Sequence, residues 1–133
     1  MKKLLLFTLV LAFFSACNND QKAVEALLKE TETIHDEAMK DMAEMNRVAR
    51  EIKEFMMSAS MTPDQSAVYT ETLTRIGQAE NDMMAWMKDF KAPEANAPSK
   101  ESMDYLGQQK EAIQKNHNDI KAATEAGKKL LGK

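Results

Sequence analysis

Cysteine, glycine, proline and aromatic residues are all scarce in this chain. Its 133 residues include one cysteine, four glycines and three prolines, and aromatic residues make up 6% of it. A single cysteine excludes an internal disulfide bond. No segment alternates apolar and polar residues for long enough to indicate a β-sheet. Alanine, glutamate, lysine and methionine dominate instead, and these residues favour helices.

The sequence also lacks the motifs of the common enzyme classes. It contains no Ser/His/Asp or Cys/His set, no glycine-rich phosphate loop and no His-Glu-x-x-His motif. Its carboxylates are scattered along solvated faces and form no isolated pair. We therefore expect a protein that is not an enzyme.

Residues 1–16 have the pattern of a secretory signal peptide. Lys2 and Lys3 give a positive start, residues 4–14 are almost wholly apolar, and two small residues precede Cys17. The apolar stretch is too short to cross a bilayer core, which needs about 20 residues in a helix. We therefore expect a cleaved leader and no transmembrane anchor.

The sequence Phe14-Ser15-Ala16-Cys17 resembles the lipobox of bacterial lipoproteins, in which cleavage precedes a diacylated cysteine. Phe14 stands where that family usually has leucine. The resemblance implies that Cys17 is lipidated and that residues 17–21 form a polar tether to the membrane surface, which two or more acyl chains can hold stably. The expected location is the cell envelope, facing the periplasm, on either the inner or the outer membrane. The alternative is a cysteine that merely ends an ordinary signal peptide.

The rest of the chain is long enough for one domain with a modest core. Loss of Lys2 and Lys3 changes the formal net charge from −3 to −5, because residues 1–16 contain no acid. This acidic balance argues against nucleic acid as a partner. Apolar residues recur at steps of three and four. They predict helices over about 22–58, 63–91 and 99–131.

Short connections make consecutive helices antiparallel, so we expect an all-α, up-down-up three-helix bundle with coiled-coil-like packing over 22–133. Thr62 and Gln65 have the spacing of a capping box at the start of the second helix, and Ser99 can cap the third. The first turns of the first helix are expected to project past the others as a stalk.

Methionines and one histidine form a band across the expected helices. His35, Met39 and Met42 are spaced by four and three residues, so they share one helix face. Turns near residues 60 and 95 would bring this face level with methionines of the other two helices. The candidate ligands in this methionine band are His35, Met39, Met42, Met83, Met84, Met87 and Met103.

Thioether sulfur is a soft donor that suits Cu(I) or Ag(I), and an imidazole can complete such a site. Methionine needs no deprotonation and forms no disulfide, which suits an oxidising compartment. The alternative is that the methionines fill the core and pack on Trp86 and Phe90. A non-covalent haem between an axial methionine and an axial histidine is a third alternative, since no Cys-x-x-Cys-His motif is present.

Two further polar residues fall within the apolar stripes. The turn positions bring Glu80 level with Lys110, and this pair would fix the register of the second and third helices. His117 is expected level with Leu73 and Ala49, away from the methionine band, as a core histidine.

The segments Ile34–Met45 and Met83–Phe90 resemble a group of small uncharacterised bacterial envelope lipoproteins. Some of their relatives carry the label "viral A-type inclusion protein", which describes coiled-coil-like sequence and implies no viral role. The spaced histidine and methionines are also similar to helical copper-binding proteins of the periplasm.

Two functions from different classes are therefore expected as alternatives. The first is a non-enzymatic, lipid-anchored helical module that binds another envelope protein or acts structurally. The second is a periplasm-facing Cu(I) or Ag(I) binder for buffering or delivery.

Overall fold

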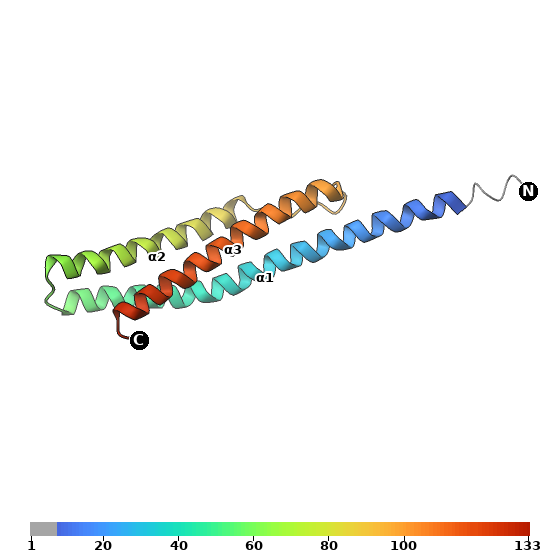
Figure 1. Ribbon diagram of the computed structural model, residues 1–133. Coiled ribbons are helices and arrows are strands. Elements are labelled where there is room, and N and C mark those ends of the chain that lie inside the picture. Colours follow the sequence, from blue (N-terminus) through green and yellow to red (C-terminus); the bar gives the residue numbers. More distant parts are fainter. Residues whose placement is uncertain (1–7) are drawn as a thin grey trace, which may run out of the picture.

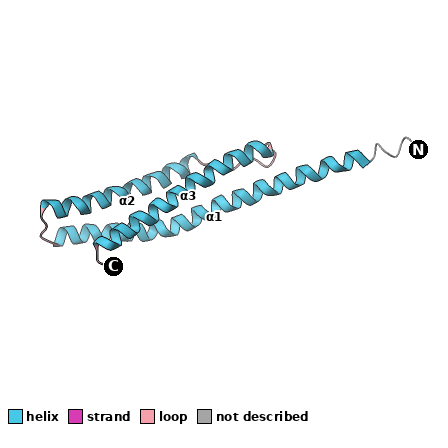
Figure 2. Cartoon of the chain, in the orientation of Figure 1, coloured by secondary structure: helices cyan, strands magenta, loops and turns pink. Residues whose placement is uncertain are grey.

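Three long helices packed side by side make up the fold (Figure 1). The computed structural model describes the backbone of residues 8–133 and the side chains of residues 19–133. The helices are α1 (Thr8–Ser58), α2 (Pro63–Asp89) and α3 (Ser99–Leu130), and no described residue forms a strand (Figure 2). The expected all-helical fold is therefore confirmed. The predicted signal peptide and the side chain of Cys17 lie outside the residues described in full.

Helix α1 is a single helix of 51 residues, and its N-terminal part extends beyond the other two helices (Figure 1). Its sequence contains neither glycine nor proline, so nothing in it favours a break. The helix runs through residues 17–21, which we expected to be a tether. The side-chain amide of Gln21 donates a hydrogen bond to the carbonyl of Ala95, 3.1 Å away. The projecting part of α1 therefore ends near Gln21, and Val24 is already buried in the bundle.

The ends of α2 and α3 agree with the predicted bounds to within two residues. The capping box of α2 is confirmed: the backbone N–H of Gln65 donates to the Thr62 hydroxyl, and the N–H of Thr62 donates to the Gln65 side chain. The expected Ser99 cap is wrong, because Pro98 occupies the N-cap of α3 and no side chain caps it. The carbonyl of Pro98 instead accepts from the N–H of Ser102.

The core draws on the apolar stripes of all three helices, as their spacing predicts. Its buried cluster consists of Ala38, Met42, Met45, Val48, Ala49, Ile52, Ile76, Ala79, Met83, Ile113, Ile120 and Ala123. Helix α3 makes its most extensive contact with α1, a smaller one with α2, and the contact of α1 with α2 is the smallest. The core is therefore organised around α3.

The register between α1 and α2 agrees with the predicted turn near residue 60. The rings of Phe55 and Tyr69 lie 5.4 Å apart near this turn, and His35 stacks on Trp86 farther along the hairpin. The helices thus run antiparallel, and His35 lies at the level of Trp86 and Met87. This is the arrangement that the methionine band requires of these two helices.

The register between α2 and α3 differs from the expected one. The Asn116 side chain donates to the carbonyl of Asp82, and the N–H of Lys91 donates to the Tyr105 hydroxyl. Each α2 residue thus faces an α3 residue about two helical turns later than a turn at residue 95 would give. The reason is that residues 90–98 continue past the end of α2 before the chain reverses, so that α3 begins beyond it (Figure 1).

Candidate functional site

The strongest candidate site is a pocket of about 450 Å³ between α1 and α2. The two helices present residues three and four positions apart, which share a face. We call this the His35 pocket, and its lining residues are Glu32, His35 and Asp36 from α1 with Trp86, Met87 and Phe90 from α2. It lies near the end of the bundle at which α1 projects, since α2 ends there at Asp89.

Four rings form a column that starts in the His35 pocket and crosses all three helices. The ring centroids are 5.6 Å apart for His35 and Trp86, 4.6 Å for Trp86 and Phe90, and 6.3 Å for Phe90 and Tyr105, with interplanar angles of 27°, 17° and 15°. Such aromatic contacts are worth about 0.5–1.5 kcal/mol each beyond their buried area. The column therefore fixes the orientation of Trp86 over the histidine ring.

His35 and Trp86 each carry a buried nitrogen without a partner. Nδ1 of His35 lies 3.2 Å from the Asp36 carboxylate, which only accepts hydrogen bonds, so in the neutral imidazole the proton sits on Nδ1. The other ring nitrogen, Nε2, then has a free lone pair. Among the described side chains, Nε2 of His35 and Nε1 of Trp86 are the buried polar atoms without a hydrogen-bond partner. Leaving such a group unpaired costs about 1–3 kcal/mol, so a ligand or water that reaches either nitrogen is stabilised there.

The structure brings some members of the methionine band together and separates others. Met83 and Met42 are buried in the core, and Met39 and Met87 pack against it from its edge. Met84 is 53% exposed and lies outside this cluster. Met103 is half-buried at the start of α3, and the α2–α3 register places it toward the loop and about two turns from the level of Met87.

The described carboxylate and imidazole groups are too scattered to form a metal site by themselves. Within residues 19–133, no three or more His, Cys, Asp or Glu side chains gather in a group that could hold a metal ion. Met87, which lines the His35 pocket, offers a thioether sulfur there as a further donor. The soft donors available in the His35 pocket are then the imidazole of His35 and the thioether of Met87.

The expected pair of Glu80 and Lys110 needs a correction. Lys110 instead donates from its ammonium group to the Glu30 carboxylate of α1, 2.5 Å away. Glu80 lies in a separate groove between α1 and α2, beside Arg50 and Lys53. The cause is the register of α2 and α3, which puts Lys110 about two turns away from Glu80.

His117 has a partner that the sequence did not indicate. Its side chain is almost fully buried, and Nε2 lies 2.7 Å from the carboxylate of Asp41 on α1, with the Lys121 ammonium 3.9 Å from the same oxygen. We expected His117 two turns farther along α1, level with Ala49. The apolar stripe of α3 correctly predicted that His117 is a core histidine. Its partner on α1 could not be predicted, because it depends on the register of α3 against the other helices.

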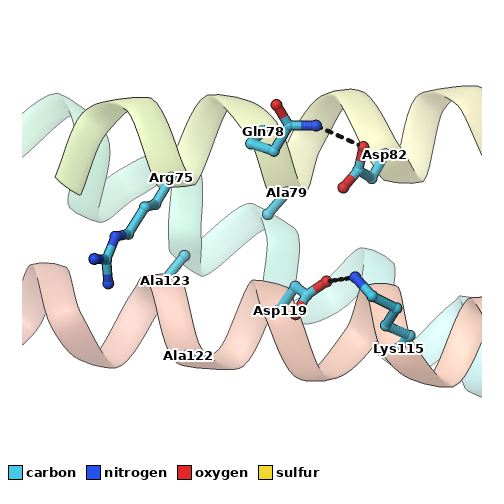
Figure 3. A pocket seen from close by; sticks show the side chains of 8 residues that line it. All are labelled: Arg75, Gln78, Ala79, Asp82, Lys115, Asp119, Ala122 and Ala123. Carbon is cyan, nitrogen blue, oxygen red and sulfur yellow. Dashed lines mark hydrogen bonds and ion pairs between the residues drawn. The ribbon is translucent and has the colours of Figure 1, made fainter. Parts of the chain in front are cut away.

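A groove between α2 and α3 has a floor of alanine and a rim of charge (Figure 3). Ala79 and Ala123 lie between the two helices. The rim groups are satisfied within their own helices: Gln78 donates to Asp82, and Lys115 donates to Asp119. The hydrogen bond from Lys115 to Asp119 raises the pKa of that lysine. Because its polar groups are already paired, we regard this groove as solvated surface.

No helix within the described part of the chain has a stretch long and apolar enough to cross a lipid bilayer. Comparison with known proteins places the chain in no family. No protein-family model matches it, no curated protein matches it, and no solved structure matches it. The likeness to envelope lipoproteins therefore stays a prediction from its residues.

Proposed function

We propose that the protein is a lipid-anchored, non-enzymatic helical module of the cell envelope that presents its bundle to another envelope protein. The proposal begins with the leader pattern and Cys17 in the sequence. The observation that carries it further is the continuity of α1, which passes from the region of Cys17 into the bundle without a break. An anchor at Cys17 would therefore be joined to the bundle by helix.

The position of Gln21 supports a defined orientation of the anchored bundle. Gln21 follows Cys17 by four residues, which is about 6 Å along a helix, and it contacts the α2–α3 loop at Ala95. The loop end of the bundle would then lie next to the membrane. The opposite end carries exposed apolar side chains, with Phe55 43%, Met57 80% and Val68 48% exposed. This end would face the envelope proteins that a structural module contacts.

Replacement of the anchoring residue tests the proposal directly. Cells producing the wild-type chain should incorporate labelled palmitate into it and retain it with the membrane fraction. Cys17→Ser should abolish the label and release the protein. Ser15→Ala, which keeps a small residue before the cut, is the matched control and should leave both unchanged. Equal labelling of wild type and Cys17→Ser would overturn the lipoprotein assignment.

The partner requires a separate experiment. A photo-crosslinking residue placed at Met57 of the anchored protein should give a discrete adduct with one envelope protein. The same residue at Glu125, exposed on the polar surface of α3, is the control. Equal adducts from both positions, or none from Met57, would contradict an interaction through this end. Soft-metal binding stands as a second candidate function, favoured by the free lone pair of His35.

A further inference from the structure

We propose that the His35 pocket binds one soft monovalent cation, Cu(I) or Ag(I), through Nε2 of His35 and the thioether sulfur of Met87. This activity goes beyond anchoring and does not depend on it. It also narrows the candidate ligands of the methionine band to His35 and Met87. Met42 and Met83 are buried in the core, Met39 packs against that core, and Met84 is exposed. Met103 lies near the start of α3, away from this pocket.

The imidazole of His35 is prepared as a ligand. Metal-binding histidines almost always donate their second ring N–H to a carboxylate, carbonyl or water, which orients the ring and fixes its tautomer. Nδ1 of His35 has this contact with Asp36. Nε2 is left with a lone pair that is buried and has no partner among the described residues.

The facing helices place His35 and Met87 at the same level. His35 and Met39 are four residues apart on α1, and Met83 and Met87 are four residues apart on α2, so each pair shares one face. The contact of His35 with Trp86 fixes the relative height of the two pairs. His35 is then level with Met87, which lines the same pocket. Met39 and Met83 lie one turn farther along, at the core and outside the pocket.

The surroundings favour a cation. Two carboxylates, Glu32 and Asp36, line the pocket and attract positive charge. The face of Trp86 lies over His35, and an aromatic face attracts a cation. The unpartnered Nε2 of His35 is a donor that such a cation would satisfy.

The donor chemistry selects the kind of cation. Thioether and imidazole ligands suit Cu(I) and Ag(I), whereas Ca²⁺ and Mg²⁺ require oxygen ligands. An organic ligand that hydrogen-bonds both His35 and the N–H of Trp86 is the competing occupant. Titration with metal alone distinguishes a metal site from a site for an organic ligand, because only a metal site would take up the ion.

The full-length chain in detergent should be titrated with Cu(I) under anaerobic conditions, in competition with a colorimetric Cu(I) chelator. Ag(I), which needs no reductant, serves as a second probe. Trp86 is the only tryptophan, so its fluorescence reports on this pocket alone. We expect one ion per chain and quenching of Trp86 that saturates at the same stoichiometry. Binding without a change in Trp86 fluorescence, or no binding tighter than the chelator allows, would overturn the proposal.

Substitutions distinguish the site from non-specific sulfur. Met87→Leu and His35→Gln should each weaken Cu(I) binding at least about tenfold. Met84→Leu is the matched control, since Met84 lies on the same turn of α2 but faces solvent, and it should bind as wild type. Leucine nearly conserves the volume of methionine, so these variants should remain folded, which a thermal melt verifies.

Equal affinities for wild type, Met87→Leu and His35→Gln would exclude this donor set even if the protein binds copper elsewhere. Cys17→Ser provides the link to the anchoring proposal. This variant should no longer associate with the membrane and should bind Cu(I) as tightly as the wild type. Either proposal can therefore fail without the other.

Discussion

At the scale of single residues, Gly127 of α3 lies against α1 with no room for a side chain. A Cβ atom built on it would lie 2.5 Å from Cγ1 of Val48 and 3.2 Å from Cδ1 of Ile52. Both neighbours are β-branched and fully buried, so neither can move aside easily. The absent side chain at this position therefore sets the spacing of the two helices.

Gly127→Ala should consequently destabilise the protein, although alanine is the better helix former. We expect the overpacking to outweigh the helix propensity and to lower the free energy of unfolding by about 1–3 kcal/mol. Gly107→Ala is the control, because a Cβ there meets nothing within 4 Å. It should stabilise the protein by about 0.5–1 kcal/mol. Urea denaturation of both variants measures the contrast, and two stabilised variants would show that the helices can move apart.

The methionines show what a sequence can predict at this scale. Met83 and Met87 continue the apolar stripe of α2 from Ile76 and Ala79, and they contribute to the core. Met84 is rotated by about 100° from Met83, so its exposure was predictable from the period of the helix. It entered the candidate ligands because it is a methionine beside other methionines. The free lone pair of His35 could not be predicted, since it depends on which side chains cover the ring.

At the scale of elements, the start of α2 depends on a reciprocal pair of hydrogen bonds between Thr62 and Gln65. Thr62→Ala removes the hydroxyl acceptor and should lower the free energy of unfolding by about 1 kcal/mol. Thr70→Ala is the control: its exposed hydroxyl donates only to the Ser66 carbonyl of its own helix, so its loss should be nearly neutral. Chemical denaturation gives both values, and a neutral Thr62→Ala would mean that water replaces the cap.

The end of α3 is tied to α1 by charge. A hydrogen bond from Arg47 holds the pKa of Glu44 below its usual range, and one from Lys133 does the same for Glu51. Lys128 also lies 3.5 Å from Glu44. A carboxyl with a depressed pKa in the folded state stabilises the fold at pH values above its ordinary pKa. That contribution is lost as the pH falls through the lowered value.

Stability should therefore fall below about pH 4.3, the ordinary pKa of glutamate. A Glu44→Gln, Glu51→Gln double variant should show a shallower fall over the same range in urea melts. Because all these groups are at the surface, about 1 M salt should reduce the difference between the two proteins. Parallel pH profiles for the variant and the wild type would rule out a role for this network.

The sequence predicts the register of α1 and α2 but not the register of α2 and α3. The hairpin of α1 and α2 closes through four residues between Ser58 and Pro63, so its pairing followed from the sequence. Residues 90–98 make a longer connection, and the sequence does not reveal how far it runs before the chain turns. The Lys110–Glu30 and His117–Asp41 contacts depend on that path. Expectations across this loop therefore failed by about two turns.

At the scale of the whole molecule, α3 makes the larger contacts and α1 touches α2 least. A chain that stops at Pro98 would expose the apolar faces of both remaining helices. We expect it to lose cooperative thermal unfolding, as followed by circular dichroism at 222 nm. Removal of residues 132–133 alone is the control. It deletes the exposed ion pair of Lys133 with Glu51 and should leave the melt cooperative and its midpoint nearly unchanged.

A cooperative melt for the shortened chain would show that the α1–α2 hairpin is itself a folded unit. The general architecture needed no structure, since helix-forming composition and apolar stripes indicate three packed helices. The central role of α3 did not follow from them, because the area that each pair of helices shares depends on the loop path.

The unbroken helix α1 also determines direction. Each helical residue turns the chain by about 100° and advances it by about 1.5 Å. One residue inserted between Cys17 and Val24 would barely change the height of the bundle, yet it would swing the His35 pocket through more than a quarter of a circle about the axis of α1. The direction in which the pocket faces therefore depends on the number of residues between the anchor and the bundle.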